Sequence, residues 1–373
     1  MKKYCYFIST TWRDSAVSNH FKRLAEELVS KGHKVVLLID NNPKNIEYEK
    51  YCFKIYKWPS SCLQLRNFKN FIFLYKLIKK HRPDCLIGNF SSVKFLMITG
   101  WLMGVPIRVA WYRTMTPAID LASPNPKWKN KLLRFRANLY YKITTHLIPV
   151  SKEAMEDLRL IHNVPPSKCY VFHNALSDPL DKTNFDFRYL SKKRRNLVCV
   201  GGLNKIKGQD VLIKALSILK SRGISVDIDF LGNGPLRKSY SELAAKLGIQ
   251  DKCHFLGGIS HNDVLKRLKL AYLSILPSHD DNCPWAIIES LSMGTPVIAS
   301  KVGGIPELIQ DRIDGFLVPP DDPKALAEKI ALLLSDKKLR DKMGKNARKK
   351  FLEKFEQKNS IKNQIEFFEK IIP

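Results

Sequence analysis

Acidic residues are scarce in this chain of 373 residues, where 35 Asp and Glu stand against 63 Lys and Arg and the formal net charge is +28. The shortage is greatest in residues 51–150, which hold 17 basic residues and only two acidic ones, Asp84 and Asp120. Beyond residue 200 the balance is closer, with 28 basic and 21 acidic residues. A first half this basic attracts anionic lipid, nucleic acid or a phosphorylated substrate.

The chain also lacks long apolar runs and cysteine motifs. No run approaches the ~20 residues needed to span a bilayer. The opening MKKYCYFIST has no cleavage site and too short an apolar run for a signal peptide, so we expect it to form a first buried strand. The eight cysteines show neither CxxC spacing nor a nearby His at metal-ligand spacing, which indicates reduced thiols in a cytoplasmic protein and no metal site. Several lie in strand-like apolar runs as small hydrophobes: Cys5, Cys85, Cys199 and Cys253.

What is present is an alternation of short β-like runs with amphipathic helical stretches, which predicts α/β architecture with mainly parallel sheets. In the first half the expected strands are 4–9, 34–39, 85–88, 107–111 and 146–150. In the second half they are 196–201, 226–232, 253–257, 273–277 and 296–300. A polar, basic stretch at 181–195 separates the halves. We therefore expect two doubly wound domains, 1–185 and 186–355, and a C-terminal helix, 356–373, that packs back on the first.

The loop in VCVGGLNKIKG (198–208) has the composition of an anion site, although neither GxGxxG nor GxxxxGK[ST] is present. Gly201 and Gly202 let backbone N–H groups approach a ligand, and a helix N-terminus follows. Lys205 and Lys207 add positive charge beside Asn204. An ordinary strand–turn–helix connection with solvated lysines explains this loop equally well.

Two carboxylates mark the segment SHDDNCPWAIIESLSMGTPVIAS (278–300). Asp281 lies in a turn-prone loop, and Glu289 lies in an apolar helix, where an ionised side chain is costly unless it has a partner. Such carboxylates accept hydrogen bonds from the vicinal hydroxyls of a sugar or ribose. The alternative is a glycosidase-like acid/base pair, for which two tandem α/β domains would be an unusual fold. Asp227 and Asp229, in the alternating run VDIDF, are expected to face solvent rather than a metal.

The motifs VGGLNKIKG, DNCPWAIIE, GTPVIAS, GGIPELI and DGFLVPPDD occur in an order and spacing that resembles the C-terminal half of family 4 retaining glycosyltransferases. The resemblance covers residues 196–355 and implies the GT-B fold, two tandem Rossmann-like domains facing across a cleft. By resemblance Asp281 contacts the donor sugar, Glu289 the ribose hydroxyls and Lys207 the diphosphate, as catalytic or substrate-binding residues. The substrate-binding set also includes Gly201, Gly202, Asn204, Lys205, Asn282 and Cys283. Gly202 takes the place of an arginine, and Asp281 that of a glutamate.

The first half resembles the family more loosely. In SAVSNHFKRLAEELVSKGHKVVLL, Ser15 and Ala16 occupy the place of a glycine pair near the donor phosphates, and His20 that of a family histidine. Many relatives carry His after the strand that reads IRVAWYRT here, where Arg113 is the candidate for contact with substrate.

The resemblance implies a hexosyltransferase that moves a sugar from a UDP- or GDP-sugar to a glycan or lipid-linked acceptor without a metal cofactor, in lipopolysaccharide, capsule or other polysaccharide biosynthesis. Residues 66–83 and 127–142 combine basic with aromatic and aliphatic side chains, as in helices that bind anionic membranes. The alternative is a pair of amphipathic helices that bury one face on the sheet and leave their lysines solvated. We expect a cytoplasmic protein on the inner face of the membrane. Open alternatives are a nucleotide-sugar epimerase or hydrolase, a non-enzymatic sensor, and a nucleic-acid-binding protein; no helix-turn-helix, RRM or zinc pattern supports the last.

Overall fold

The computed structural model describes residues 2–11, 16–40, 53–62, 68–116, 126–181 and 196–372. Contacts within the chain divide it into two compact units. Unit 1 contains the described residues up to His173 and those from Gln357 onward, and unit 2 contains Asn174–Glu356. The boundary expected at residue 185 falls outside the described residues.

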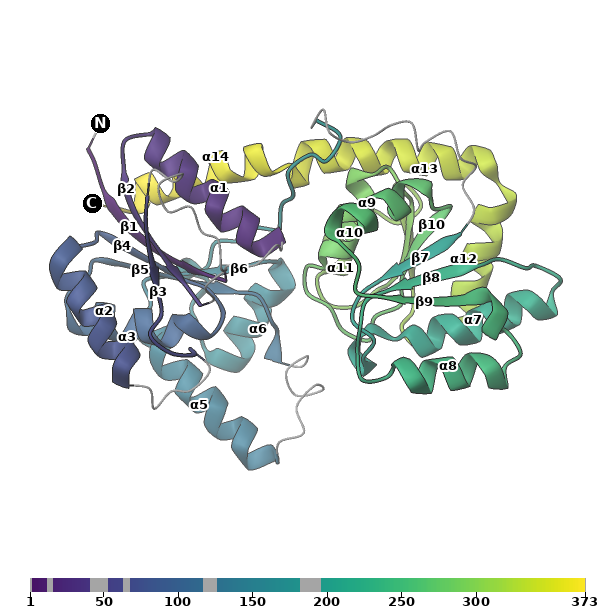
Figure 1. Cartoon of the computed structure of the whole chain (residues 1–373), viewed down its shortest axis with the longest axis horizontal. Helices are drawn as coiled ribbons and strands as arrows, with labels where there is room; N and C mark the ends of the chain where they lie inside the picture. The colour runs from purple at the N-terminus through teal and green to yellow at the C-terminus, as the bar shows by residue number, and fades with distance from the viewer. Residues whose placement is uncertain are drawn as a thin grey trace. The chain divides into compact units, whose positions relative to one another are not determined.

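Unit 1 is built on a six-stranded sheet in which every pairing is parallel. Its order is β3-β2-β1-β4-β5-β6, with strands β1 (Cys5–Thr10), β2 (Lys34–Ile39), β3 (Lys54–Lys57), β4 (Cys85–Gly88), β5 (Ile107–Tyr112) and β6 (His146–Pro149). Helices α1 (Ala16–Ser30) and α14 (Gln357–Ile371) pack together on one side of the sheet (Figure 1). The other α-helices in the described part of unit 1 are α2 (Phe68–His81), α3 (Val93–Leu102), α5 (Lys127–Ile143) and α6 (Lys152–His162), with α2, α3 and α5 on the other side.

Unit 2 repeats the same plan. Its parallel sheet has the order β12-β11-β10-β7-β8-β9. The strands are β7 (Leu197–Val200), β8 (Ile228–Leu231), β9 (Cys253–Gly257), β10 (Leu273–Leu276), β11 (Val297–Ser300) and β12 (Gly315–Val318). The helices are α7 (Gln209–Ser221), α8 (Arg237–Lys246), α9 (His261–Leu270), α10 (Trp285–Ser292), α11 (Ile305–Leu308), α12 (Pro323–Ser335) and α13 (Lys337–Lys350).

The strands form because they are continuous apolar runs that helices cover on both faces. All six residues of β1 are buried, as are all four residues of β10 and of β11. Each fully buried Ile, Leu or Phe of these strands stabilises the fold by ~2 kcal/mol relative to leaving it exposed. The predicted α/β architecture with two tandem doubly wound units is confirmed. Cys5, Cys85, Cys199 and Cys253 lie buried in the strands as free thiols, as expected.

Both sheets read 3-2-1-4-5-6 when the strands of each unit are counted in chain order. In such a sheet the connections diverge on either side of the first strand, so a crevice opens beyond the carboxyl ends of the first and fourth strands. That switch point lies between β1 and β4 in unit 1 and between β7 and β10 in unit 2. Loops that carry chemistry are therefore expected at these two places.

The prediction that Asp229 faces solvent is wrong. Its side chain is buried and accepts hydrogen bonds from Arg267 Nη1 at 2.7 Å and Asn196 Nδ2 at 3.1 Å. Alternation does not indicate exposure here because β8 is an inner strand between β7 and β9, with covered faces on both sides. Asp227 precedes the strand and lies 3.1 Å from His254 Nε2.

Candidate functional site

The loops that follow β7 and β10 meet at the switch point of unit 2. Lys207 Nζ, from the first loop, lies 2.5 Å from Asp281 Oδ2, from the second, although 74 positions separate them in the chain. The topology brings the two side chains together, because β7 and β10 are hydrogen-bonded parallel neighbours whose carboxyl ends lie at the same edge of the sheet. The pair is partly buried, so the ammonium and the carboxylate interact more strongly than they would in water.

The backbone of the first loop is fixed by its own polar groups. Asn204 Oδ1 accepts hydrogen bonds from the backbone N–H groups of Ile206 at 3.1 Å and Lys207 at 3.3 Å, which closes a short 3-10 turn. Gly208 then adopts a φ of +62° and begins α7. A Cβ at Gly208 would lie 2.1 Å from the carbonyl oxygen of Pro277, so only glycine allows the two loops to approach this closely.

Backbone contacts tie three loops together around Asp281. The N–H of His279 donates to the carbonyl of Ile206 at 2.8 Å, which joins the β10 loop to the β7 loop. The N–H of Gly304, in the loop after β11, donates to the carbonyl of Asp281 at 3.1 Å. Asp281 Oδ1 also accepts from the N–H of Asn282 at 3.1 Å. The carboxylate is therefore held in one place before any ligand arrives.

Glu289 lies one turn inside α10 and is 7% exposed. Burial raises its pKa from 4.5 to about 7, because the ionised carboxylate loses hydration that the surrounding apolar side chains do not replace. Its Oε1 lies 3.4 Å from Nδ1 of His261, the first residue of α9. The helix containing Glu289 follows the Asp281 loop directly, so both predicted carboxylates belong to the same edge of the sheet.

The other residues predicted in unit 2 divide into two groups. Gly201, Gly202 and Lys205 belong to the first loop, where the carbonyl oxygen of Gly202 accepts a hydrogen bond from Gln209 Nε2 at 3.0 Å and Lys205 is exposed. Asn282 and Cys283 are buried beside Asp281. The carbonyl of Cys283 accepts from Asn174 Nδ2 at 2.7 Å, and its Sγ accepts from the N–H of Asn174 at 3.4 Å.

The residues predicted in the first half lie in unit 1. His20 is buried in α1, with its Nε2 3.0 Å from Oε1 of Gln364 in α14, and burial together with the charge of Arg113 lowers its pKa to about 4. Arg113 follows β5, and its Nε donates to Asn89 Oδ1 at 3.0 Å. Ala16 begins α1, whereas Ser15 lies outside the described residues.

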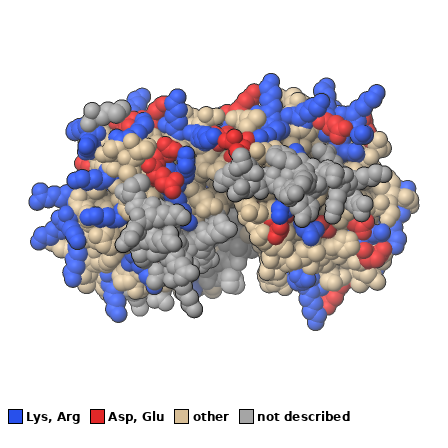
Figure 2. All heavy atoms as spheres, turned by 45° about the horizontal axis from the view of Figure 1, so that its top comes forward, with Lys and Arg blue, Asp and Glu red and all other residues tan. Residues whose placement is uncertain are grey.

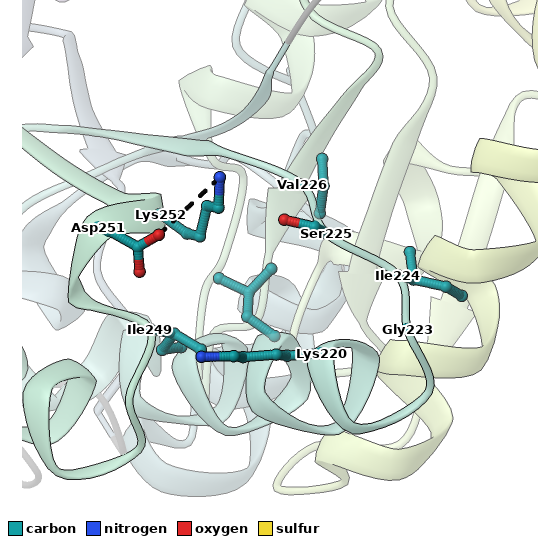
Figure 3. A pocket seen from close by; sticks show the side chains of 9 residues that line it. Lys220, Gly223, Ile224, Ser225, Val226, Ile249, Asp251 and Lys252 are labelled. Carbon is teal, nitrogen blue, oxygen red and sulfur yellow. Dashed lines mark ion pairs between the residues drawn. The ribbon is translucent and has the colours of Figure 1, made fainter.

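A cavity of about 200 Å³ lies at the opposite edge of the unit 2 sheet (Figure 3). Its lining comes from the end of α7 and from the segments that precede β8 and β9, including Lys220, Ile224 and Ile249. It is therefore separate from the Lys207–Asp281 edge. Within the described ranges no three His, Cys, Asp or Glu side chains group as metal ligands.

Sequence reasoning missed several residues of the site. His261 and Asn174 come from segments far from the motifs in the chain, and only the folded topology brings them to Glu289 and Cys283. One local signal was available for His261, which opens a helix directly after a strand that ends in Gly257. In a parallel sheet that position lies at the ligand-binding edge.

Two parallel-sheet units, one with a lysine–carboxylate pair and a glycine-bearing loop at its switch point, define a class of proteins that bind phosphorylated ligands such as nucleotides. Comparison with known proteins narrows the class. Residues 17–178 match the model of Glycosyltransferase Family 4, and residues 181–350 match the model of Glycosyl transferases group 1.

Individual relatives agree with this assignment. An alpha-D-kanosaminyltransferase of Streptomyces kanamyceticus is 31% identical over 274 residues, which span 70% of this chain and 69% of the relative. A glycosyltransferase of Methanocaldococcus jannaschii is 28% identical over 231 residues, or 60% of this chain, and the match spans 59% of that relative's length. The chain therefore belongs to the family 4 (group 1) glycosyltransferases.

The fold agrees with the family. The Anabaena protein HepE, solved in complex with UDP, superimposes with a TM-score of 0.77 at 18% identity, over 98% of this chain and 100% of that one. At this identity the likeness shows the GT-B fold of two tandem units.

Proposed function

We propose that the protein transfers a sugar from a nucleoside diphosphate sugar to an acceptor hydroxyl, with retention of configuration at the anomeric carbon. The observation that carries the proposal is the Lys207–Asp281 pair at the β7/β10 switch point, followed by the buried carboxyl of Glu289 on α10. A cation for a diphosphate and two carboxylates for hydroxyl groups are what such a donor requires. The UDP complex of HepE favours a UDP-sugar over a GDP-sugar.

In this proposal Lys207 binds the diphosphate while Asp281 keeps its ammonium in place. Gly201 and Gly202 let the backbone approach the phosphates, and Lys205, exposed beside them, adds charge. Asp281 accepts hydrogen bonds from the donor sugar, and Glu289 from the ribose hydroxyls. Lys207 can bind a diphosphate oxygen without giving up Asp281, because a protonated ammonium has three N–H donors.

The chemical step exchanges one C–O bond for another. The bond from the anomeric carbon to the diphosphate oxygen breaks, and a bond to the acceptor oxygen forms on the same face of the sugar. The acceptor's proton passes to the departing diphosphate. Negative charge that develops on the diphosphate is stabilised by Lys207, and removal of one such preorganised donor lowers kcat by about 10²- to 10³-fold. We propose that no divalent cation is needed for this role, so an excess of EDTA should leave transfer unchanged.

The proposed acceptor is a lipid-linked or cell-envelope glycan, such as a precursor of lipopolysaccharide or capsule, at the inner face of the membrane. Support comes from unit 1, where α5 exposes a stripe of apolar side chains at Trp128, Leu132, Phe135 and Leu139. Trp128 is 69% exposed and Phe135 61% exposed, and exposed basic residues flank the stripe. Among the described residues no helix is both long and apolar enough to cross a bilayer, so we propose peripheral docking.

The test begins with a thermal-shift screen of UDP-, GDP-, ADP- and dTDP-sugars, since a ligand that binds only the folded protein raises the unfolding temperature. With the donor identified, Lys207→Ala and Glu289→Ala should each reduce transfer by at least about 100-fold while the protein remains folded. Lys214→Ala is the matched control, because Lys214 is exposed on α7 and pairs with Asp210 of its own helix at 3.0 Å.

Wild-type turnover in both variants would refute the proposed site. Release of free sugar at the same rate with and without acceptor would instead indicate a nucleotide-sugar hydrolase that uses the same edge of unit 2. The product's anomeric configuration, read by NMR, decides between retention and inversion.

A further inference from the structure

His279 contacts the turn that carries Lys207, although sequence reasoning gives it no role. It lies in the loop after β10, two residues before Asp281, and its backbone N–H donates to the carbonyl of Ile206 at 2.8 Å. Its ring lies against the end of the same turn, since a Cβ at Gly208 would come within 3.3 Å of His279 Nε2. His279 therefore contacts the residues on both sides of Lys207 in the chain.

A carboxylate faces each nitrogen of the His279 ring. Nδ1 lies 2.9 Å from Oδ1 of Asp321, in the loop after β12, and Nε2 lies 3.7 Å from Oδ1 of Asp210, in the first turn of α7. The other oxygen of Asp210 accepts from Lys214 Nζ at 3.0 Å, so its two partners do not compete. One side chain, only 18% exposed, thus connects the loop after β10 with α7 and with the loop after β12.

Asp321 adopts a backbone conformation that favours glycine. Its φ is +57°, whereas its neighbour Asp322 caps α12 by accepting from the N–H of Ala325 at 2.9 Å. A residue with a side chain is strained at such a φ, and glycine is not. The Asp321 side chain is 69% exposed, and an ion pair this exposed contributes little to folding stability. Neither backbone nor stability explains a carboxylate here, whereas the contact with His279 does.

We propose that His279 and Asp321 are positioning residues for Lys207, and that the pair holds the loops after β7, β10 and β12 in the arrangement that binds a diphosphate. Lys207 reaches Asp281 from a turn that His279 contacts on both sides. An anchored His279 therefore fixes where the ammonium lies before the donor arrives, which is the preorganisation that a charged ligand requires. The inference rests on the proposed glycosyltransferase activity and adds a connection that acts through Lys207.

Asp321→Gly is the decisive variant, because it separates positioning from stability. Glycine relieves the strain at this φ, so the unfolding temperature should equal or exceed that of the wild type. The variant also removes the partner of His279, so the affinity for UDP, measured by calorimetric titration of the full chain, should fall by about 3- to 10-fold. Loss of a negative charge near an anionic ligand would by itself strengthen UDP binding, so weaker binding is not a charge effect.

His279→Ala breaks the same pair from the other side and should weaken UDP binding at least as much. The double variant should bind UDP no more weakly than His279→Ala alone, because each single substitution already removes the interaction. Asn163→Gly is the matched control. Asn163 is exposed at the end of α6 with a φ of +52°, so glycine relieves the same backbone strain in unit 1 and should leave UDP affinity unchanged.

Hydrogen exchange of the free protein follows the turn without any ligand. In the wild type the backbone N–H of Ile206 and that of Lys207 are bonded to Asn204. Amides of residues 204–208 should exchange at least about 3-fold faster in Asp321→Gly and in His279→Ala, because the turn opens locally more often. Amides of α8, which is not part of the connection, should keep the wild-type rates in both variants.

Failure of this inference is distinguishable from failure of the proposed function. A wild-type protein that binds UDP, with Asp321→Gly and His279→Ala that bind it equally well, keeps the proposed function and overturns the inference. So does an Asp321→Gly variant whose unfolding temperature falls together with its affinity, because the pair then serves stability alone. A wild-type protein that binds neither UDP nor GDP refutes the proposed function. Unchanged exchange of residues 204–208 overturns the inference in either case.

Discussion

Glu289 lies in an apolar helix, and its burial sets the pH range over which it ionises. Its folded-state pKa of about 7 exceeds the ordinary value of 4.5, so between these pH values the folded protein holds a proton that the unfolded chain releases. Stability contributed by this proton is fully present below pH 4.5 and is lost as the pH rises through 7. A shift of this size corresponds to about 3 kcal/mol.

The first residue-scale prediction concerns Glu289→Gln, which keeps the shape of the side chain and removes its titration. Between pH 4.5 and pH 8 the unfolding temperature of the wild type should fall relative to that of the variant. Nucleotide-sugar affinity should change in the opposite direction, because the ionised carboxylate is the better acceptor for ribose hydroxyls. Wild-type affinity should therefore rise through pH 7 and that of Glu289→Gln should not.

Thermal unfolding and calorimetric titration at pH 5, 6, 7 and 8 measure both effects. The comparison of wild type with variant removes the contributions of ionisable groups that do not interact with Glu289. If the unfolding temperature and the nucleotide-sugar affinity of the two proteins change in parallel with pH, ionisation of Glu289 is not the cause of either change.

At the residue scale, sequence reasoning identifies side chains that are unusual where they stand in the chain. Glu289 is such a residue, because a carboxylate within IIESLS already implies a buried charge. Asn89 is not, because nothing in GNFSS indicates that its amide meets Arg113, 24 positions away. The prediction that Asp229 faces solvent failed for a related reason. Its partners Arg267 and Asn196 come from a helix and from the start of a strand, which only folding brings close to it.

At the scale of elements, α7 and the loop before it depend on one glycine. Gly208 ends the 3-10 turn that contains Lys207 and begins the helix, with positive φ and with the Pro277 carbonyl directly against its Cα. The turn and the β10 loop must therefore move apart if a side chain is added. That movement separates Lys207 from Asp281.

Gly208→Ala is predicted to destabilise unit 2 and to weaken nucleotide-sugar binding together. Gly223→Ala is its matched control, because Gly223 also has a positive φ, +76°, but a Cβ there meets nothing within 4 Å. The control isolates the cost of the left-handed backbone, about 1–2 kcal/mol. Gly208→Ala should lower the unfolding temperature further than Gly223→Ala and should alone reduce donor affinity, as measured by thermal unfolding and titration. Equal effects of the two substitutions would contradict the steric argument.

Most elements were predictable, because central strands are apolar runs bounded by glycine or polar residues and helices such as α1 and α6 have an amphipathic period. The exception in unit 1 is β3, whose sequence KIYK is half polar because it lies at the edge of the sheet. In the tail, a five-residue π-helical turn, Phe351–Phe355, follows α13 before α14 begins. Its insertion depends on packing of Phe351 and Phe355, both buried, rather than on local propensity.

At the scale of the whole molecule, charge and exposed apolar surface coincide on the helices of unit 1. Helix α2 exposes Phe68, Ile72 and Tyr75 one or two turns apart, among Lys69, Lys76, Lys79 and Lys80. Helices α2 and α5 both pack against α3, which exposes Trp101 and Leu102 at its end. Figure 2 shows Lys and Arg side chains crowded along the left margin of the view, the side on which α2 lies in Figure 1. Apolar stripes flanked by cations suit the interface of an anionic bilayer.

We predict that the protein sediments with vesicles containing phosphatidylglycerol and not with vesicles of phosphatidylcholine alone. Each basic side chain near the surface contributes ~1 kcal/mol, so Lys131→Gln and Arg136→Gln together should weaken binding by about 30-fold. Raising the salt from 0.1 to 1 M should weaken vesicle binding as well, because the Debye length falls from ~10 to ~3 Å.

The apolar stripe of α5 is tested separately. Trp128→Ser combined with Phe135→Ser should remove the vesicle binding that persists at 1 M salt. Leu160→Ser, at an exposed apolar position on α6, serves as the control for loss of apolar surface. Equal binding to both kinds of vesicle, or variants that bind like the wild type, would show that this surface of unit 1 does not dock on the membrane.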